Sequence, residues 1–281
     1  MNLIQAILMG IVQGLSEFLP VSSSGHLVFT SNFYKVFKGM EIIQHSNEEI
    51  FFDIMLHFGT LIAVFIYFRK EILEIIKALY VGVKTRNYSD KNAKIGLYII
   101  LGTFITIAFA LPMEKIAEKL VYSPAIVGVL LVITGIILFV SEYYSKKFKE
   151  NNAELNIKNS TIVAIAQGLA VLPGFSRSGW TIAAGLFSGL DRVTAARYSF
   201  LLSIPIILGA SMLYPVIKID IQQAATYNWT AIIVGTVVSG MVGYACIKYF
   251  LKFLAKFSLV VFGYYCVIVG LGTAVFFSIW G

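Results

Sequence analysis

Long apolar runs alternate with short polar segments along this chain. Six of the runs are long enough for one membrane crossing each, since a hydrocarbon layer about 30 Å thick takes about 20 helical residues. The predicted crossings are 52–68, 95–113, 124–141, 198–217, 229–247 and 257–280. The last five contain no Asp, Glu, Lys, Arg or His, whereas the first contains Asp53 and His57. The pattern predicts an all-α polytopic membrane protein.

Two further apolar regions, 1–34 and 160–190, are each interrupted near the middle by Pro, Gly and Ser. The arms on either side are too short to span comfortably, so both regions are predicted to be re-entrant helix pairs that return to the side from which they enter. Irregular backbone at membrane depth is tolerated only when it is buried in protein or lines a cavity. The sequence therefore predicts a cavity at the two breaks.

The two breaks have related sequences, QGLSEFLPVSSSGH over 13–26 and QGLAVLPGFSRSGW over 167–180. Each half then has one re-entrant pair and three crossings, and an odd number of crossings inverts the second half relative to the first. The sequence predicts an inverted-topology repeat, 1–141 and 160–281, joined by a cytoplasmic linker at 142–159. The tips of the two re-entrant pairs are expected to meet near the midplane.

The positions of the basic residues predict the orientation. Sixteen of the 22 Lys and Arg residues lie in four segments between the apolar regions, and five lie in the segments on the opposite side. The positive-inside rule makes the first group cytoplasmic, which leaves both termini outside. The four segments are 69–94, 142–159, 190–197 and 248–256.

Composition agrees with a membrane protein, at 58% hydrophobic residues, 13% charged residues and a mean hydropathy of +0.82. The net charge of +7 does not indicate a nucleic-acid partner, because the basic residues lie where a membrane protein places them for topology. Cys246 and Cys266 lie in apolar segments without a second ligand at metal spacing, and they are predicted to be buried and reduced.

Gln13 and Glu17 are four residues apart, so they share one face of a helix. A carboxylate and an amide oxygen are ligands for a hard divalent cation such as Mg²⁺ or Ca²⁺, with phosphate oxygens and water completing the shell. The alternative is a hydrogen-bonded pair that closes a helix end. A carboxylate within the membrane costs a few kcal/mol unless it is paired or used, which favours a functional role.

Ser22, Ser23, Ser24, Gly25 and His26 form a predicted hydroxyl-rich turn that ends in an imidazole. A serine with a histidine three residues later can pair a nucleophile with a general base, or the histidine can attack phosphorus directly. Serines at such a position also cap helices by accepting hydrogen bonds from free amides. Both interpretations stay open from the sequence.

Arg177 lies at the helix break of the second region. Its guanidinium presents a fork of donors that matches phosphate oxygens. Ser176, Ser178 and the free amides of a helix N-terminus would add donors for an anion. Thr181 is predicted to cap or support this loop, and the alternative role for Arg177 is a salt bridge to Glu17.

Four further polar residues have two interpretations each. Asp53 and His57 are four apart in the first crossing. They either lie behind the residues that contact substrate and orient them, or form a structural pair. Arg192 and Arg197 either anchor a helix at the cytoplasmic surface or contact substrate.

At these residues the sequence resembles the bacterial undecaprenyl-diphosphate phosphatase family, which is associated with bacitracin resistance. The resemblance rests on Gln13 to His26, on PGFSRSGWT over 173–181 and on FLLSIP over 200–205, and it covers essentially the whole chain. It implies removal of the terminal phosphate from a C55 polyprenyl diphosphate, which regenerates the lipid carrier for peptidoglycan at the bacterial plasma membrane. It also implies a divalent-cation requirement and indirect competition by bacitracin, which binds the substrate.

The resemblance also implies roles for individual residues. Glu17 is the essential carboxylate of a Glu/Gln-x-x-x-Glu motif, and Gln13 occupies a position where many members have Glu. Ser23 is the proposed nucleophile, His26 its base or proton donor, and Arg177 the diphosphate clamp, while attack by an activated water stays open. The remaining candidates for substrate binding are Ser22, Ser24, Ser176, Ser178 and Thr181.

The competing class is a polyprenyl-phosphate transporter, since inverted repeats with broken helices that meet at the midplane also describe secondary transporters. Such a protein would use Arg177 without any nucleophile. Small residues four apart, such as Ser239 and Gly243, permit packing of a homodimer. The leaflet that supplies the substrate and the preferred lipid chain length are open.

Overall fold

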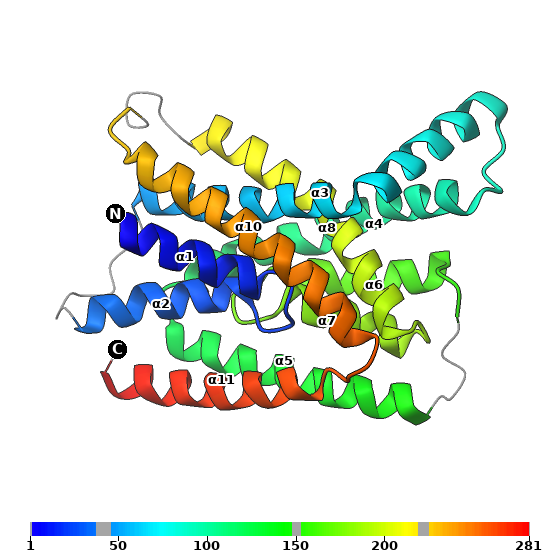
Figure 1. Ribbon diagram of the computed structural model, residues 1–281. Coiled ribbons are helices and arrows are strands. Elements are labelled where there is room, and N and C mark those ends of the chain that lie inside the picture. Colours follow the sequence, from blue (N-terminus) through cyan, green and yellow to red (C-terminus); the bar gives the residue numbers. More distant parts are fainter. Residues whose placement is uncertain (1, 38–45, 148–152, 219–224, 281) are drawn as a thin grey trace.

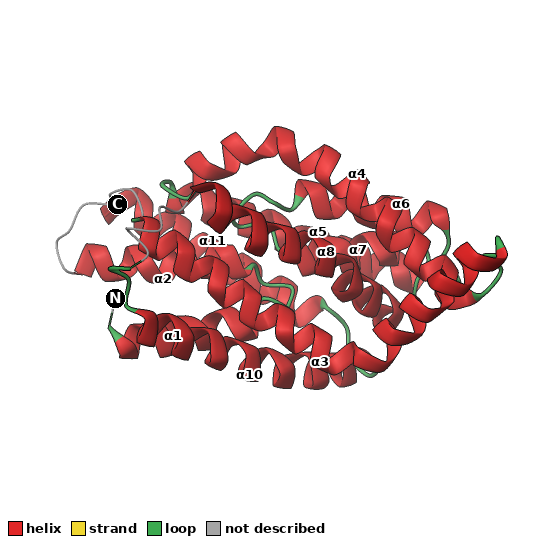
Figure 2. Ribbon diagram, turned by 90° about the horizontal axis from the view of Figure 1, so that it is seen from above, coloured by secondary structure: helices red, strands yellow, loops and turns green. Residues whose placement is uncertain are grey.

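The computed structural model describes residues 2–37, 46–147, 153–218 and 225–280. All regular secondary structure within these ranges is helical (Figure 2). The helices are α1 (Leu3–Ser16), α2 (Ser23–Phe37), α3 (Asn47–Thr85), α4 (Lys91–Leu120), α5 (Pro124–Lys147), α6 (Ile157–Leu169), α7 (Arg177–Phe187), α8 (Arg192–Lys218), α10 (Trp229–Leu254) and α11 (Val260–Trp280). The predicted all-α class is confirmed for the described residues.

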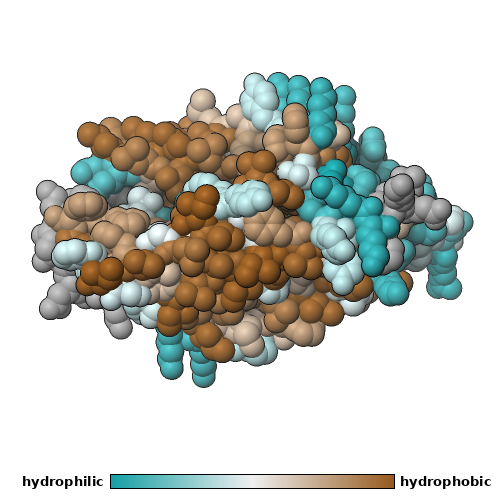
Figure 3. Space-filling view, turned by 90° about the horizontal axis from the view of Figure 1, so that it is seen from below, coloured by the Kyte–Doolittle hydropathy of each residue, from teal (hydrophilic) through white to brown (hydrophobic). Residues whose placement is uncertain are grey.

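Six of the described helices are long and apolar enough to cross a membrane, namely α3, α4, α5, α8, α10 and α11. Each contains most or all of one predicted crossing, so the described part of the chain has six candidate membrane-spanning helices in the predicted order. Large apolar side chains cover the outside of these helices, for example Phe104 with 68% exposed and Ile268 with 69% exposed. Figure 3 shows apolar side chains across the middle of one face and hydrophilic ones gathered toward its right-hand end.

Helix α3 is longer than the apolar run that predicted it. It continues past 68 to Thr85, which makes it 39 residues or about 58 Å long. Arg86 ends it in the left-handed region with φ of 54°, and Asp90 caps α4 by accepting from two backbone amides. The predicted polar segment 69–94 is therefore mostly helical.

The two regions with a central break form two pairs of short helices. Their members have 14 and 15 residues in α1 and α2, and 13 and 11 residues in α6 and α7. Each is only about 17 to 23 Å long, less than the thickness of the hydrocarbon layer. In Figure 1 the α1–α2 pair extends toward the end that holds both termini, the α6–α7 pair extends the opposite way, and their turns meet in the middle. Because α2 begins at Ser23 and runs to Phe37, most of the predicted hydroxyl-rich turn is the first turn of a longer helix.

Glycines allow the short helix α1 to approach α10 very closely. A Cβ added at Gly14 would lie 2.7 Å from the carbonyl oxygen of Ser239 and 3.0 Å from the nitrogen of Gly243. Both of these α10 residues are buried, and the Ser239 hydroxyl donates to the carbonyl of Leu56. The small-residue pair that would permit packing of a homodimer is thus used for packing inside the chain.

Candidate active site

Glu17 lies at the centre of the site, directly after α1, and only 6% of it is exposed. Its Oε1 accepts a hydrogen bond from Arg177 Nη2 in an ion pair. Its Oε2 accepts from Gln13 Nε2 at 3.0 Å and from Ser23 Oγ at 2.7 Å, and His57 Nε2 lies 3.6 Å away. Groups from α1, α2, α3 and α7 therefore converge on one buried carboxylate.

Ser22 shapes the first turn, which is the segment 17–22 between α1 and α2. Its φ of 69° places it in the left-handed region, and its Oγ accepts from the amide of Gly25 at 3.2 Å. The capping role considered for the serines therefore applies to Ser22, whereas Ser23 directs its hydroxyl to Glu17. A Cβ at Gly25 would lie 3.4 Å from the Cα of Gly174 in the other turn, so the two turns are in close contact.

His26 points toward α11 and has no hydrogen bond to Ser23 among the described residues. Its Nδ1 lies 2.8 Å from the carbonyl oxygen of Ser22, and its Nε2 lies 2.7 Å from the hydroxyl of Tyr265. A carbonyl oxygen can only accept, so Nδ1 donates to Ser22, and the contact of Nε2 with the Tyr265 hydroxyl suits an acceptor nitrogen when the ring is uncharged. The two rings are stacked with centroids 5.7 Å apart, which fixes the plane of the imidazole.

The second turn, which is the segment 170–176 between α6 and α7, places Arg177 as the first residue of α7. Ser176 is the N-cap, and its Oγ accepts from the amide of Gly179 at 3.1 Å. Ser178 Oγ donates to the carbonyl of Leu19 at 2.9 Å, which ties the second turn directly to the first. The hydroxyls of Ser176 and Ser178 are 3.2 Å apart, so both are engaged in holding the turns together.

Thr181 supports the same turn from inside the helix. Its hydroxyl lies 2.7 Å from the carbonyl of Arg177 and 2.6 Å from the hydroxyl of Ser199 in α8. It is fully buried. The predicted supporting role agrees with this position, which braces the residue that carries the guanidinium.

Thr134 of α5 holds the second turn from outside, and sequence reasoning did not find it. Its Oγ1 lies 3.2 Å from the carbonyl oxygen of Gly174, and it accepts from the amide of Ser176 and from Trp180 Nε1, both at 3.3 Å. A single threonine in an apolar helix has no spacing signal that distinguishes it from a lipid-facing one. Tyr265, the partner of His26, was missed for the same reason.

Free carbonyl groups of the first turn are satisfied by side chains from other helices. Cys246 Sγ donates to Leu15 and Cys266 Sγ donates to Pro20, each at 3.3 Å. Both cysteines are free thiols and buried, as predicted. The two thiols therefore tie the end of α1 and the segment that follows it to α10 and α11.

Two polar atoms at the site have no hydrogen-bond partner among the described residues, although both are buried. They are Arg177 Nη1, a donor, and Gln13 Oε1, an acceptor. Buried polar groups are usually hydrogen-bonded, so each of these two atoms is available to contact a bound group. A phosphate oxygen suits the guanidinium, and a cation suits the amide oxygen.

The donors present fit a hard divalent cation only when substrate and water contribute the rest of its shell. The described residues contain no group of three His, Cys, Asp or Glu side chains that could hold a metal. Oxygen donors are nonetheless available from Glu17, from Gln13 Oε1 and from Ser23, which is the ligand type that Mg²⁺ and Ca²⁺ prefer.

Asp53 and His57 contribute in different ways. The His57 ring holds the backbone carbonyl of Asp53 through Nδ1 at 2.8 Å and turns Nε2 toward Glu17. His57 is therefore next to the central carboxylate, whereas Asp53 orients it through its main chain.

Arg192 and Arg197 are held by structural ion pairs. Arg192 makes two bonds of 2.8 and 2.7 Å to Glu142, a buried carboxylate that also accepts from the amide of Leu259. Arg197 pairs with Glu71 at 2.5 Å. These contacts agree with the anchoring role.

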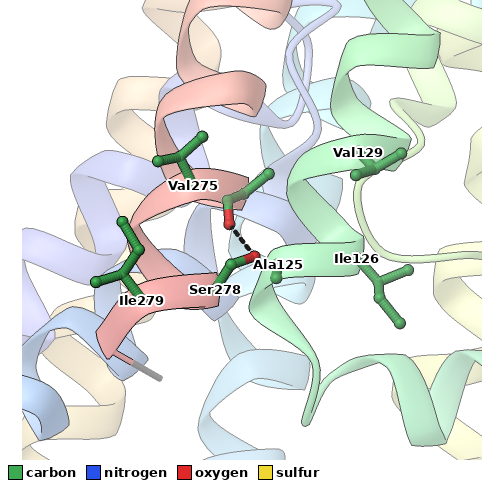
Figure 4. A pocket seen from close by; sticks show the side chains of 7 residues that line it. Ala125, Ile126, Val129, Val275, Ser278 and Ile279 are labelled. Carbon is green, nitrogen blue, oxygen red and sulfur yellow. Dashed lines mark hydrogen bonds between the residues drawn. The ribbon is translucent and has the colours of Figure 1, made fainter.

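A groove between α5 and α11 is separate from this site (Figure 4). Its volume is about 410 Å³, and its one side-chain hydroxyl, that of Ser278, already donates to the carbonyl of Ala274. It offers no charged group. It is lined by Ala125, Ile126, Val129, Ala274, Val275, Ser278 and Ile279.

The fold and the site define an all-helical, multi-pass membrane protein with one polar centre, built where two broken helix pairs meet. Residues 6–272 match the family model described as bacitracin resistance protein BacA, and the chain belongs to this family. It is 39% identical over 273 residues to an undecaprenyl-diphosphatase of Halothermothrix orenii, with 96% of each chain covered. It is 41% identical over 283 residues to a protein of the same name from Desulfatibacillum aliphaticivorans, with 96% of this chain and 97% of the relative covered. A Methanobrevibacter smithii relative, also named undecaprenyl-diphosphatase, is 39% identical over 283 residues with 96% of each chain covered.

Proposed function

We propose that this protein is an integral membrane phosphatase that hydrolyses undecaprenyl diphosphate to undecaprenyl phosphate and inorganic phosphate. The observation that carries the proposal is the contact between Glu17 and Arg177, which brings both polar motifs into one buried site. Membership of the BacA family and the names of the relatives support the same activity. The reaction recycles the lipid carrier for cell-wall synthesis and so confers resistance to bacitracin, which competes by binding the substrate.

Arg177 is the proposed clamp for the diphosphate. Its Nη1 is buried without a partner, while its Nη2 is held by Glu17. A guanidinium with one occupied and one free amino group can donate hydrogen bonds to a phosphate oxygen without first breaking the ion pair. The substrate then lies beside Ser23, which contacts the same carboxylate.

The negative charges of the diphosphate would repel Glu17 unless they are neutralised. Glu17 and the free oxygen of Gln13 would hold a divalent cation, Mg²⁺ or Ca²⁺, which supplies charge neutralisation to the phosphates when bound. With glutamine at position 13, Glu17 is the one carboxylate that the family motif supplies here, so this residue would carry most of the metal binding.

Ser23 is the proposed nucleophile. Its Oγ attacks the terminal phosphorus, the bond from that phosphorus to the bridging oxygen breaks, and undecaprenyl phosphate leaves. Glu17 Oε2, at 2.7 Å, is placed to take the hydroxyl proton, and His26 would protonate the leaving oxygen or activate the water that releases phosphate from the serine. Attack by water or by His26 directly is the competing route.

The two halves are proposed to form an inverted repeat with two re-entrant pairs. The extensive packing of α1 on α10 has its counterpart in the packing of α6 on α4. The opposite directions of the α1–α2 and α6–α7 pairs support the same relationship (Figure 1). Basic residues gather at the end away from the termini, so this end would face the cytoplasm of a bacterial cell and both termini the outside.

A polyprenyl-phosphate transporter is the second candidate, because two broken helix pairs meeting at one anion site suit alternating access. The contact of Ser23 with Glu17 favours the enzyme, since transport needs no activated hydroxyl.

The decisive experiment measures phosphate release from undecaprenyl diphosphate by the purified protein in detergent, where transport has no meaning. Release that needs a divalent cation and is lost in Arg177→Ala and Glu17→Ala supports the phosphatase. Lys256→Ala, at an exposed position, is the matched control and should retain full activity. No release by the wild type with any metal would overturn the proposal, and transport into vesicles would then be tested.

A further inference from the structure

The C-terminal part of α3, residues 69–85, forms a projection that we call the α3 extension. Figures 1 and 2 both show it leaving the helix bundle together with the start of α4. With a helix of about 58 Å and a hydrocarbon layer of about 30 Å, this part of α3 lies beyond the membrane-spanning part.

One face of the α3 extension carries a stripe of exposed apolar side chains. Leu73, Ile76, Tyr80 and Val83 are 55%, 56%, 69% and 67% exposed, and their spacing of three, four and three residues places them along one face. This stripe does not pack on α4, because Leu79 lies against Gly96 from another side of the helix. An exposed apolar stripe of this kind on a polar projection marks an interaction surface.

A row of lysines runs beside the stripe. Lys70, Lys77 and Lys84 are seven residues apart, and at 100° per residue they lie on one side of the stripe. All three are exposed, and none forms an ion pair with a residue that the structure describes. Segment 69–94 has seven basic and three acidic residues, so the surface is cationic. An apolar stripe beside a row of lysines is typical of helices at a membrane interface.

We infer that the α3 extension docks on an anionic lipid surface, the headgroup layer of the bilayer that the protein crosses. The stripe enters the boundary between headgroups and acyl chains, and the lysine row binds lipid phosphates. A second copy of the chain is a poorer occupant, because two surfaces that each carry an exposed row of lysines repel one another. This inference is independent of the proposed phosphatase activity.

The test places an environment-sensitive fluorophore on the stripe with Tyr80→Cys, and on the face turned away from it with Glu74→Cys. Labelling is selective because Cys246 and Cys266 are buried. Single proteins in nanodiscs of neutral lipid, or of neutral lipid mixed with anionic lipid, are then exposed to acrylamide, an uncharged aqueous quencher. In anionic discs we expect the Tyr80 probe to be quenched several-fold less than the Glu74 probe, with emission shifted to the blue.

Replacing Lys70, Lys77 and Lys84 together with glutamine should raise quenching of the Tyr80 probe in anionic discs to its level in neutral discs. Replacing the same three lysines with arginine should leave the probe protected from acrylamide. Phosphate release in detergent should be the same as in wild type for both. Equal quenching of the Tyr80 and Glu74 probes in anionic discs would overturn the inference. This comparison does not depend on any lysine variant. The inference would also be overturned if the Tyr80 probe were protected equally in neutral and anionic discs. The same holds if the probe were protected only in discs that contain two copies of the protein.

Discussion

Glu17 and Arg177 are 160 residues apart in sequence and form an ion pair where the turn after α1 meets the start of α7. Glu17 is buried and 18% of the Arg177 side chain is exposed, so neither charge is solvated as it would be in water. The pair therefore couples the assembly of the two helix pairs to the chemistry of the site.

Removing one partner of this pair should cost both activity and stability. Arg177→Ala leaves the Glu17 carboxylate buried without its cation, which costs about 3 kcal/mol or more of folding free energy. The double variant Glu17→Gln, Arg177→Met should regain stability, because no charge is left unpaired, but it should remain inactive. Thermal unfolding in detergent and phosphate release measure the two quantities, and a double variant as unstable as Arg177→Ala would show that the charges are not coupled.

Replacing Ser23 separates the routes to hydrolysis. If its hydroxyl is the nucleophile, Ser23→Ala should lower kcat by about 10³-fold or more, as loss of an attacking group does in other hydrolases. A rapidly quenched reaction of the wild type should yield phosphoserine at position 23 by mass spectrometry. Full activity in Ser23→Ala would eliminate this route and favour attack by water.

Tyr265 should act through His26. Tyr265→Phe keeps the stacked ring but removes the hydroxyl that lies 2.7 Å from His26 Nε2. Loss of one hydrogen bond of about 1 kcal/mol predicts a fall in kcat of about five-fold with little change in KM. The same substitution in a His26→Ala background should have no further effect, and additive losses would show that Tyr265 does not act through His26.

Gln13 should set the concentration of cation that the enzyme needs. Gln13→Glu adds a second carboxylate beside Glu17 and should lower the half-saturating concentration of Mg²⁺ or Ca²⁺ about ten-fold, whereas Gln13→Leu removes the free amide oxygen and should raise it. Phosphate release titrated with metal after chelation gives these values. Identical titrations for the three proteins would remove Gln13 from the metal site.

The crossings and the meeting of the two motifs could be predicted because each depends on a strong one-dimensional signal. An apolar run of membrane length has few alternatives, and a carboxylate and a guanidinium at two helix breaks must find partners inside the protein. The length of α3 was not predicted, because the apolar run ends at Arg69 while the helix continues with a different, amphipathic pattern. Nor could the sequence separate Ser22 from Ser23, since their roles depend on the backbone φ of Ser22.

The sequence could not predict which residues of the long apolar helices position the site. Thr134 and Tyr265 are isolated polar residues in apolar helices, and only the packing of α5 and α11 brings them to the turns. The pairing of Ser23 with Glu17 rather than with His26 is likewise a result of tertiary geometry, because sequence spacing favoured the histidine.

The division of the charged centre between two distant parts of the chain has a consequence for biosynthesis. Glu17 is synthesised 160 residues before Arg177. The early chain contains Gln13, Ser23 and His57, all of which contact or approach the carboxylate in the finished protein. The first half of the chain thus supplies three of the groups around Glu17, and the carboxylate gains its counterion only when the second helix pair has been made.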